Sequence, residues 1–428
     1  MKALPALVVS DEEGNLFDLP EYAMPVRHGN SIVLPGKKDI ISLPCGSDLH
    51  TLPGRYPVGI DRRSGKMLTL REYEGMRLRA ASAFLAPAYT ALHTAAFEGQ
   101  AGADTLPLFA YAPLGIEGDD FVTTAMRVDR EVRQDCENFD QDEVLRRGKK
   151  LLERFAGNRL TTHLIENCAF TYLCPAARNW VMGRWEAPIP VSQGCNSQCT
   201  GCISMQEEDS GIPSTQDRLL FTPTAEEITA FTVPHLEEAP GAVVSFGQGC
   251  EGEPLTQAML IEDSIREIRK RTKRGTINLN SNASLPAAVE RLCIAGLDSI
   301  RVSANSLQKR YYDRYFSPKG YSFDDVIESI AIAKRHNVWV SLNYFIFPGF
   351  TDSETELSAL TALLRQFPVD MIQMRNLNMD PDLYISTLGE EAFEHLGGFG
   401  IRQWMKEVRK VSPAICFGYF NPCLDSAL

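Results

Sequence analysis

The chain has 428 residues, which is long enough for two or three domains with a large buried core. Apolar residues make up 44% and charged residues 23%, as in ordinary globular proteins, so wholesale disorder is excluded. The formal net charge of −12 makes the chain a poor partner for phosphate backbones, and we expect it not to bind nucleic acid.

The start of the chain shows no export signal, because a short apolar run is followed at once by Asp11 and Glu12. The segment 81–97, which has no charged residues, is rich in Ala and contains Pro87, which predicts a buried helix and no membrane span. We therefore expect a soluble, cytoplasmic protein. Its eleven cysteines are then free thiols or metal ligands, and not disulfides.

Residues 1–187 are expected to form an α+β region that could recognise the substrate. Its Pro- and Gly-rich segment 43–61 fits either a stiff loop between strands or a recognition surface. Helical patterns cover 71–97, 140–155 and a further stretch up to Cys168. The predicted strands, of which the first two and the last two form hairpins, are 7–9, 16–19, 31–34, 39–43, 106–112, 115–120 and 121–128.

From Pro188 onward, short β-branched runs alternate regularly with helical patterns. The segments Thr224-Ala-Glu-Glu227 and Ser353-Glu-Thr-Glu356 are predicted capping boxes at helix starts. This alternation predicts an α/β fold, with a partial (β/α)6 TIM-like barrel and a C-terminal extension in 188–428; a flavodoxin-like open sheet is the alternative. In such a barrel, catalytic groups gather at the carboxyl ends of the strands. The six predicted strands are 189–193, 242–246, 276–280, 299–303, 338–345 and 371–376.

The strongest chemical signal is Gly194-Cys195-Asn-Ser-Gln-Cys199-Thr-Gly-Cys202, directly after the first of these strands. A structural zinc ion is enclosed by four ligands, and a [4Fe–4S] cluster that only carries electrons likewise takes four cysteines. Three ligands leave one iron open to bind a substrate. The alternatives are a zinc site with a distant fourth ligand and three incidental thiols.

This C-x3-C-x2-C motif resembles that of the radical S-adenosylmethionine (radical SAM) superfamily, and the resemblance extends over more than half of the chain. It implies that Cys195, Cys199 and Cys202 hold a [4Fe–4S] cluster whose open iron binds S-adenosylmethionine. Gly252 and Glu253, after the second strand, resemble the family element that holds the amino group of the methionine part.

Small polar side chains at the ends of the third and fourth strands resemble those that contact the carboxylate and ribose of S-adenosylmethionine, although Asn and Ser also simply close loops. The loop 347–352 resembles the one that borders adenine. Gly201 departs from the pattern, because many members have an aromatic residue there that lies against adenine; stacking must come from elsewhere. The strand-end candidates are Asn280, Ser281, Asn282, Ser303 and Asn305.

The resemblance implies an enzyme in which the reduced cluster cleaves S-adenosylmethionine to a 5′-deoxyadenosyl radical that removes hydrogen from a substrate. A low-potential electron donor of the ferredoxin or flavodoxin type would reduce the cluster. We expect a small molecule or cofactor precursor as substrate; the alternatives are a peptide-modifying enzyme and a non-catalytic iron–sulfur or zinc protein that transfers electrons or binds a partner. The candidate substrate contacts, at the end of the sixth strand and just beyond it, are Arg375, Asn376, Asn378 and Asp380.

The other cysteines are scattered along the chain, which predicts buried free thiols and no auxiliary cluster. Peptide-modifying members carry a cysteine-rich C-terminal extension, whereas this chain has only Cys416 and Cys423 there. Cys250, between the second strand and Gly252, fits a small core residue or a hydrogen donor to a product radical.

Overall fold

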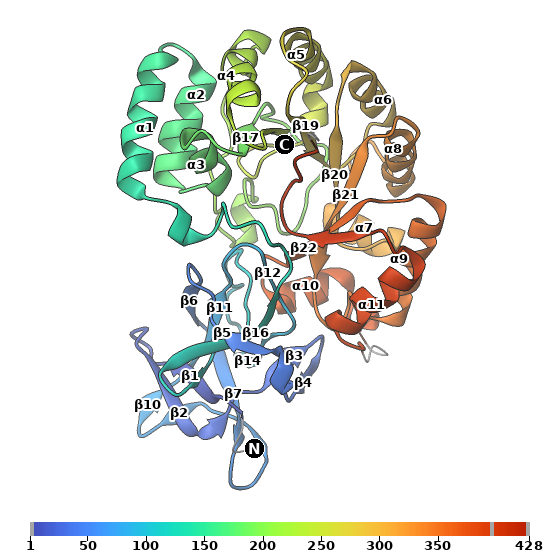
Figure 1. The fold of residues 1–428 in the computed structure, drawn as a ribbon. Helices are drawn as coiled ribbons and strands as arrows, with labels where there is room; N and C mark the ends of the chain where they lie inside the picture. Colours follow the sequence, from blue (N-terminus) through green and yellow to red (C-terminus); the bar gives the residue numbers. More distant parts are fainter. Residues whose placement is uncertain (1–3, 394–397, 425–428) are drawn as a thin grey trace.

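Parallel strands and the helices between them fill the second half of the chain (Figure 1). The structure is a computed structural model that describes residues 4–393 and 398–424. Seven strands form one sheet, in which each strand pairs in parallel with the next along the chain. They are β17 (Glu186–Ile189), β18 (Val243–Phe246), β19 (Thr276–Ser281), β20 (Ser299–Ala304), β21 (Trp339–Ile346), β22 (Met371–Asn376) and β23 (Cys416–Gly418).

The sheet curves into a barrel that stays open, because β17 and β23 do not pair within the described part of the chain. The sequential strand order confirms the predicted partial barrel and excludes the flavodoxin-like order. The short strand β23 was not predicted, since three residues give no periodic signal. The helices that cover the barrel are α4 (Ala225–Glu238), α5 (Ala258–Arg271), α6 (Pro286–Ala295), α7 (Lys309–Phe316), α8 (Phe323–Arg335), α9 (Glu354–Gln366), α10 (Pro381–Leu388) and α11 (Ile401–Val411).

Helix α5 shows how these helices pack, because Ile261, Ile265 and Ile268 recur on one face and are fully buried. Thr224 forms the predicted capping box before α4. Ser353 also caps α9, but the side chain of Glu356 does not turn back to complete the box. Instead it enters the core and accepts a hydrogen bond from the Tyr344 hydroxyl at 2.5 Å. Among the described residues, no helix is both long and apolar enough to cross a membrane.

The first barrel strand lies earlier than predicted, since β17 shares only Ile189 with the predicted strand 189–193. Pro190 has no N–H to offer a neighbouring strand. The N–H groups of Val191 and Ser192 donate to the buried Glu251 carboxylate, at 2.8 and 2.9 Å. The chain therefore leaves the sheet before the cysteine loop begins.

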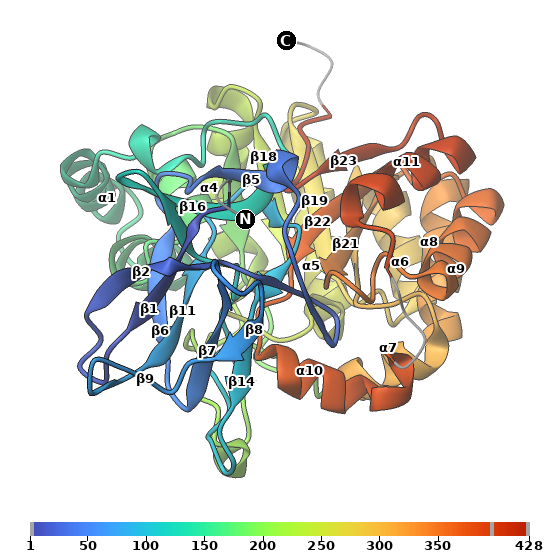
Figure 2. The same cartoon turned by 90° about the horizontal axis from the view of Figure 1, so that it is seen from below.

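The amino-terminal region is mostly sheet and lies beside the barrel (Figure 2). Most of its strands belong to one antiparallel sheet, with smaller two- and three-stranded sheets at its margin. Its strands are β1 (Ala6–Ser10), β2 (Leu16–Ala23), β3 (Val26–His28), β4 (Ser31–Val33), β5 (Ile40–Ser42), β6 (Asp48–Leu52), β7 (Arg55–Asp61), β8 (Met67–Thr69), β9 (Glu72–Tyr73), β10 (Met76–Arg77), β11 (Arg79–Phe84), β12 (Tyr89–Ala91), β13 (Thr94–Ala95), β14 (Phe97–Gly99), β15 (Gly115–Glu117) and β16 (Asp120–Arg127).

The predicted helix 71–97, including the buried helix 81–97, is wrong: this stretch forms β9 to β14. Strand β11 pairs with β6, from Ala80 opposite Leu52 to Phe84 opposite Asp48. The sheet pairing therefore overrides the high helix propensity of the alanines. The predicted strand 106–112 is also wrong, since it contributes only a single bridge from Ala112 to Ala83.

A helical segment connects the amino-terminal sheet to the barrel. Its residues Val144, Leu164 and Trp180 belong to the same buried cluster as the barrel residues Ile189 and Phe231. The helices thus share the hydrophobic core of the barrel; the domain boundary at 187/188 stays a prediction. The elements are α1 (Gln141–Arg154), α2 (Arg159–Thr162), a π-helix (His163–Thr171) and α3 (Pro175–Val181).

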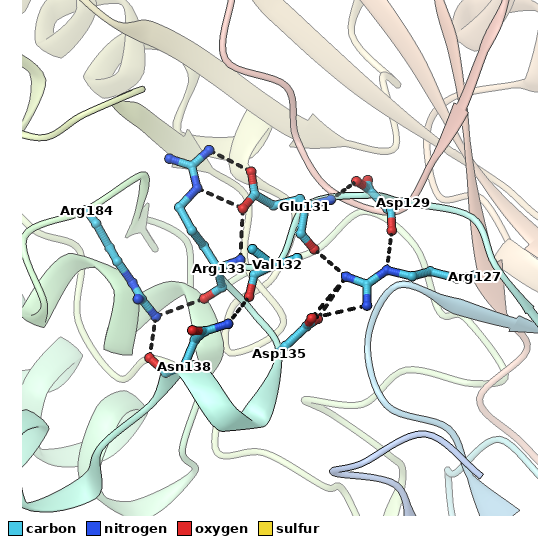
Figure 3. A network of polar contacts seen from close by, with 8 residues as sticks. All are labelled: Arg127, Asp129, Glu131, Val132, Arg133, Asp135, Asn138 and Arg184. Atoms are coloured by element: carbon cyan, nitrogen blue, oxygen red, sulfur yellow. Dashed lines mark hydrogen bonds and ion pairs between the residues drawn. The ribbon is translucent and has the colours of Figure 1, made fainter. Parts of the chain in front are cut away.

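A polar network holds the segment that leaves the amino-terminal sheet (Figure 3). Arg127, at the end of β16, pairs with Asp135 at 3.0 Å. Asp129 accepts a hydrogen bond from the backbone N–H of Tyr419 at 2.8 Å, so it also reaches the C-terminal segment. The network thus joins the sheet, the helical segment and the end of the barrel. Its members are Arg127, Asp129, Glu131, Val132, Arg133, Asp135, Asn138 and Arg184.

Candidate active site

The three-cysteine loop follows β17 and is held in place by helix α7. Gln198 N donates to Phe316 O, and Thr200 N donates to Tyr315 O, each at 3.0 Å. Beside the loop lies a cavity of about 650 Å³, a volume typical of small-molecule sites. All three predicted ligands line it: Cys195, Cys199 and Cys202.

The donor set at this cavity favours a polynuclear metal centre. Among the described residues, no fourth cysteine and no histidine lines the cavity. A single zinc ion with Zn–S bonds of about 2.3 Å would keep each pair of sulfur atoms within about 4.6 Å. The three sulfur atoms do not all lie within 4.8 Å of one another. They therefore suit a larger cluster with one open position better than one zinc ion.

The loop after β18 packs directly against the cysteine loop. Gly252 N donates to Ser192 O and Glu253 N donates to Gly194 O, both at 2.9 Å. A Cβ atom at position 252 would lie 1.9 Å from Gly194 O, so only glycine allows this approach. The structure thus brings the predicted Gly252 and Glu253 to the three cysteines.

The Glu253 carboxylate is buried and partly occupied by groups of the chain itself. It accepts hydrogen bonds from Leu255 N, the Ser281 hydroxyl and Asn282 N, at 3.0, 2.6 and 2.8 Å. Burial raises its pKa to about 7. A carboxylate offers about four acceptor positions, so one remains for a ligand such as an ammonium group.

The other strand-end candidates divide into two groups. Asn282 contacts the cysteine loop, because its Nδ2 donates to Asn196 Oδ1 at 2.8 Å. Asn280 instead donates to Gly247 O at 2.7 Å, within the barrel wall. Ser303 is half-buried in β20. Asn305 is fully buried; its Nδ2 donates to Tyr311 O at 3.1 Å, whereas its Oδ1 has no partner among the described residues.

Arg218 is a residue of this site that the sequence did not reveal. Its Nη2 lies 3.6 Å from Cys202 Sγ and 3.1 Å from the Ser204 hydroxyl. A guanidinium here offsets negative charge on the sulfur. It follows no recognisable motif and lies outside regular secondary structure, so no sequence signal marked it.

Steric crowding explains why residue 201 is glycine and not an aromatic residue. A Cβ atom at this position would lie 2.7 Å from Tyr315 Oη and 3.4 Å from Met379 Sδ. Tyr315, on α7, therefore occupies the space that an aromatic residue at position 201 would need. Burial raises the pKa of Tyr315, so its hydroxyl stays protonated.

Two of the four predicted substrate residues at and after the end of β22, Asn376 and Asp380, hold the amino-terminal sheet on the barrel. The Asn376 side chain accepts from Ala91 N at 2.8 Å and donates to Tyr89 O at 2.9 Å. The buried Asp380 accepts from Arg55 Nη2 at 2.7 Å. Asn378 is exposed. The sheet thus covers the carboxyl edge of β22, where catalytic groups gather in such barrels.

The amino-terminal region also covers the loop 347–352, which is predicted to border adenine. Gly29 N donates to Pro348 O at 2.7 Å. His28 Nε2 lies 3.2 Å from the buried Asp352 carboxylate. The amino-terminal region therefore contacts the ends of both β21 and β22.

Two arginines lie in the barrel interior. Arg301 Nη1, on β20, donates to Gln373 Oε1 on β22 at 3.2 Å, and such a bond across the intervening strand requires both side chains to point inward. Arg375 donates to Tyr419 O at 3.1 Å. Burial, and then the neighbouring Arg375, lower the pKa of Arg301 to about 9. Its Nε has no partner among the described residues.

Comparison with protein families identifies one domain. Residues 189–361 match the model of the radical SAM superfamily, and this segment contains all three cysteines. The comparison with curated proteins gives no match.

Several solved structures are similar to this chain. HydG, a maturase of the [FeFe]-hydrogenase, has 16% identity and a TM-score of 0.39, over 67% of this chain and 65% of HydG. A radical SAM methyltransferase from Sphaerobacter thermophilus has 16% identity and a TM-score of 0.37, over 54% and 64%. Methylornithine synthase (PylB) has 13% identity and a TM-score of 0.37, over 63% of this chain and 78% of PylB. This chain therefore spans slightly less than two thirds of HydG. Identities and TM-scores this low do not assign the substrate or reaction of these proteins to this chain.

Proposed function

We propose that this chain, whose residues 189–361 are a radical SAM domain, is a radical SAM enzyme that acts on a small anionic molecule. Members of this superfamily are enzymes. The observation that carries the proposal is the cavity lined by exactly three thiols, with the Gly252–Glu253 loop packed against it. Cys195, Cys199 and Cys202 would hold the [4Fe–4S] cluster.

The cluster and S-adenosylmethionine together supply, when bound, a 5′-deoxyadenosyl radical that removes hydrogen from a substrate. The remaining acceptor position of Glu253 would bind the ammonium group of S-adenosylmethionine. Asn305 Oδ1, which is buried without a partner, would accept a hydrogen bond from a ribose hydroxyl. Ser281, Asn282 and Ser303 stay candidate contacts for the carboxylate and ribose.

The amino-terminal sheet would exclude water from the barrel mouth during the reaction. It covers the ends of β21 and β22 through contacts such as Gly29 to Pro348 and Tyr89 to Asn376. Thiols and other small hydrogen donors from the solvent would quench a carbon radical, so such a cover protects the chemistry. A ferredoxin or flavodoxin would supply the electron from outside.

The substrate class follows from Arg301 and Arg375. Two guanidinium groups in one interior are costly unless anions pair with them, and the buried Glu186 carboxylate offsets only part of this cost at Arg301. Arginine also binds carboxylate and phosphate groups in a bidentate way. We infer a small substrate with a carboxylate or phosphate group that Arg301 Nε and Arg375 would hold.

Anaerobic reconstitution with iron and sulfide, followed by dithionite and S-adenosylmethionine, tests the activity. Equal amounts of 5′-deoxyadenosine and methionine are expected. Protein that contains its full complement of iron but forms no 5′-deoxyadenosine would contradict the proposal. It would favour a non-catalytic electron-transfer protein.

A further inference from the structure

A second group of metal-ligating side chains lies behind the Gly252–Glu253 loop. The ligand atoms of His163, Cys168 and Cys250 all lie within 4.8 Å of one another. Within residues 4–393 and 398–424, this is the only such group of histidine, cysteine or acidic side chains. Cys168 and Cys250 are buried, at 4% and 6% exposed, so the group is not a chance cluster on the surface.

The π-helix places two of these ligands together. His163 begins this helix and Cys168 lies five residues later. In an α-helix with 3.6 residues per turn, side chains five apart diverge to different faces. The i→i+5 hydrogen bonds of a π-helix bring residues five apart close to one face, and such helices are rare and frequently found at functional sites. The unusual backbone therefore serves the convergence of His163 and Cys168.

The spacing of the sulfur atoms fits one tetrahedral metal ion. Cys168 Sγ and Cys250 Sγ are 3.9 Å apart. Two thiolates bound tetrahedrally at about 2.3 Å from a zinc ion are about 3.8 Å apart. A disulfide would require about 2.05 Å. The pair is thus placed for a shared ion and not for a covalent bond.

Cys174 is a further thiol beside this group, although its sulfur does not lie within 4.8 Å of all three ligand atoms. It lines, together with Cys168 and Cys250, a cavity of about 50 Å³. Its backbone N–H donates to Cys168 O at 2.8 Å, which holds the two cysteines together at the end of the π-helix. His163 interacts with the Cys250 thiol, although its buried Nε2 meets no partner within standard hydrogen-bond geometry among the described residues. A metal ion shared with the thiolate would satisfy this nitrogen more fully than the thiol does.

We propose that His163, Cys168 and Cys250 bind one zinc ion, and that the side chain of Cys174 turns toward the ion to complete its shell. Three cysteines and one histidine are a usual ligand set of structural zinc, because four ligands close the coordination shell. On binding, the three thiols lose their protons to solvent and the neutral imidazole gives a lone pair, so no electron is transferred. The site needs no cluster or S-adenosylmethionine and is independent of the proposed activity.

The ion would link the helical segment to the loop after β18, which is part of the proposed active site. Cys250 directly precedes Glu251, whose carboxylate holds Val191 N and Ser192 N at the start of the cysteine loop. Cys250 is also close in sequence to Gly252. The site would therefore fix the loop that the active site uses.

Metal analysis of the full-length protein tests the proposal. The protein is produced without a histidine tag in medium with iron and zinc, purified anaerobically and dialysed with a weak chelator. Mass spectrometry of the metals then counts zinc and iron separately. We expect about one zinc per chain in the unmodified protein. The same zinc content is expected in a variant with Cys195, Cys199 and Cys202 all replaced by Ala, whereas its iron is lost.

Single substitutions locate the ion. Cys168→Ser and Cys250→Ser are expected to lower zinc at least tenfold, while Cys293→Ser, a half-buried cysteine on α6, keeps it. Cobalt binding to the triple variant should produce the absorption of thiolate-bound tetrahedral cobalt, which does not depend on whether the serine variants fold. Unmodified protein without zinc, or folded serine variants with full zinc, would overturn the proposal. Zinc is counted separately from iron and from 5′-deoxyadenosine, so a protein without zinc that still forms 5′-deoxyadenosine contradicts only the zinc site, and a protein with zinc that forms none contradicts only the proposed activity.

Discussion

Arg55 and Asp380 form a buried ion pair that joins the amino-terminal sheet to the barrel. Arg55 Nη2 lies 2.7 Å from Asp380 Oδ2, and the two side chains are 5% and 2% exposed. The same carboxylate oxygen accepts a hydrogen bond from Leu106 N at 3.0 Å, while Oδ1 accepts from Asp382 N at the start of α10. Asp380 thus connects three segments that are distant in the sequence.

Asp380→Asn should therefore destabilise the protein. Removal of one partner of a buried pair leaves an uncompensated charge, which costs about 3–5 kcal/mol in the free energy of unfolding. Urea unfolding measures this value. Asp382→Asn is a matched control, because the Asp382 side chain, which pairs with Arg27, is 45% exposed, and we expect a loss below about 1 kcal/mol. Equal effects of the two substitutions would show that the Asp380 pair is not structural.

The contacts of Asp380 also show what the sequence alone does not predict. The regular alternation after Pro188 predicted the strands β18 to β22 closely, placed the first barrel strand too late, and put polar residues at the carboxyl ends of the strands. It could not show that Arg55 and Leu106 bind Asp380, because those partners lie more than 270 residues away and meet it only in the folded chain. A local sequence pattern predicts a strand and where it ends. Long-range packing decides which residues contact the side chains at that end.

The same reason explains the error at 71–97. Alanine favours helix where nothing else decides, and Ala80 and Ala83 carry no sign that β6 will pair with them. The three cysteines were easier to predict, because their ligand role depends on a short spacing within one loop. Arg218 and the group around His163 were missed, since each depends on segments that meet only through the fold.

Gly252→Ala should disrupt the contact between the two loops of the proposed active site. The added Cβ would lie 1.9 Å from Gly194 O, so the loops must separate. We expect at least a tenfold loss in affinity for S-adenosylmethionine, equivalent to about 1.4 kcal/mol. Equilibrium dialysis of the anaerobic protein measures it. Gly194→Ala is the control from the same contact, because its Cβ would meet no atom within 4 Å; equal losses in both variants would refute the explanation.

Arg218→Gln should lower the reduction potential of the proposed cluster. The guanidinium lies 3.6 Å from Cys202 Sγ and stabilises the more negative, reduced state. A differential interaction of about 1.4 kcal/mol corresponds to about 59 mV for one electron, which is the size of shift that we expect. A potentiometric titration followed by electron paramagnetic resonance measures it. Arg218→Lys keeps the charge and should stay close to wild type; an unchanged potential in Arg218→Gln would contradict the role.

His235 should make the protein less stable in acid. Its ring donates to Trp185 O at 2.6 Å, and burial lowers its pKa to about 4. The unfolded chain takes up a proton near pH 6.5, whereas the folded chain does not until about pH 4, so the contribution is present above pH 6.5 and is lost as the pH falls. Between pH 7 and 5 the loss is about 2 kcal/mol for this residue.

Urea unfolding at the two pH values tests this expectation. His93 should add a similar loss, because burial and then His28 lower its pKa to about 4. His235→Gln should therefore lose about 2 kcal/mol less than wild type on acidification. His336→Gln, at an exposed position, should behave like wild type. An unchanged pH dependence in His235→Gln would contradict the assignment.

Arg301→Met should stabilise the protein while impairing its function. A charged group that burial and Arg375 both destabilise raises the free energy of the folded state, and replacement of such buried charges by apolar residues can add about 1–4 kcal/mol of stability. Urea unfolding at pH 7.5 measures the gain, and Arg301→Lys, which keeps a positive charge, should not show it. If Arg301→Met is instead less stable, the guanidinium is a structural partner of Glu186 and the Gln373 side chain. A gain in the free energy of unfolding would mean that Arg301 destabilises the folded protein. This is expected of a residue that is retained to bind an anionic substrate.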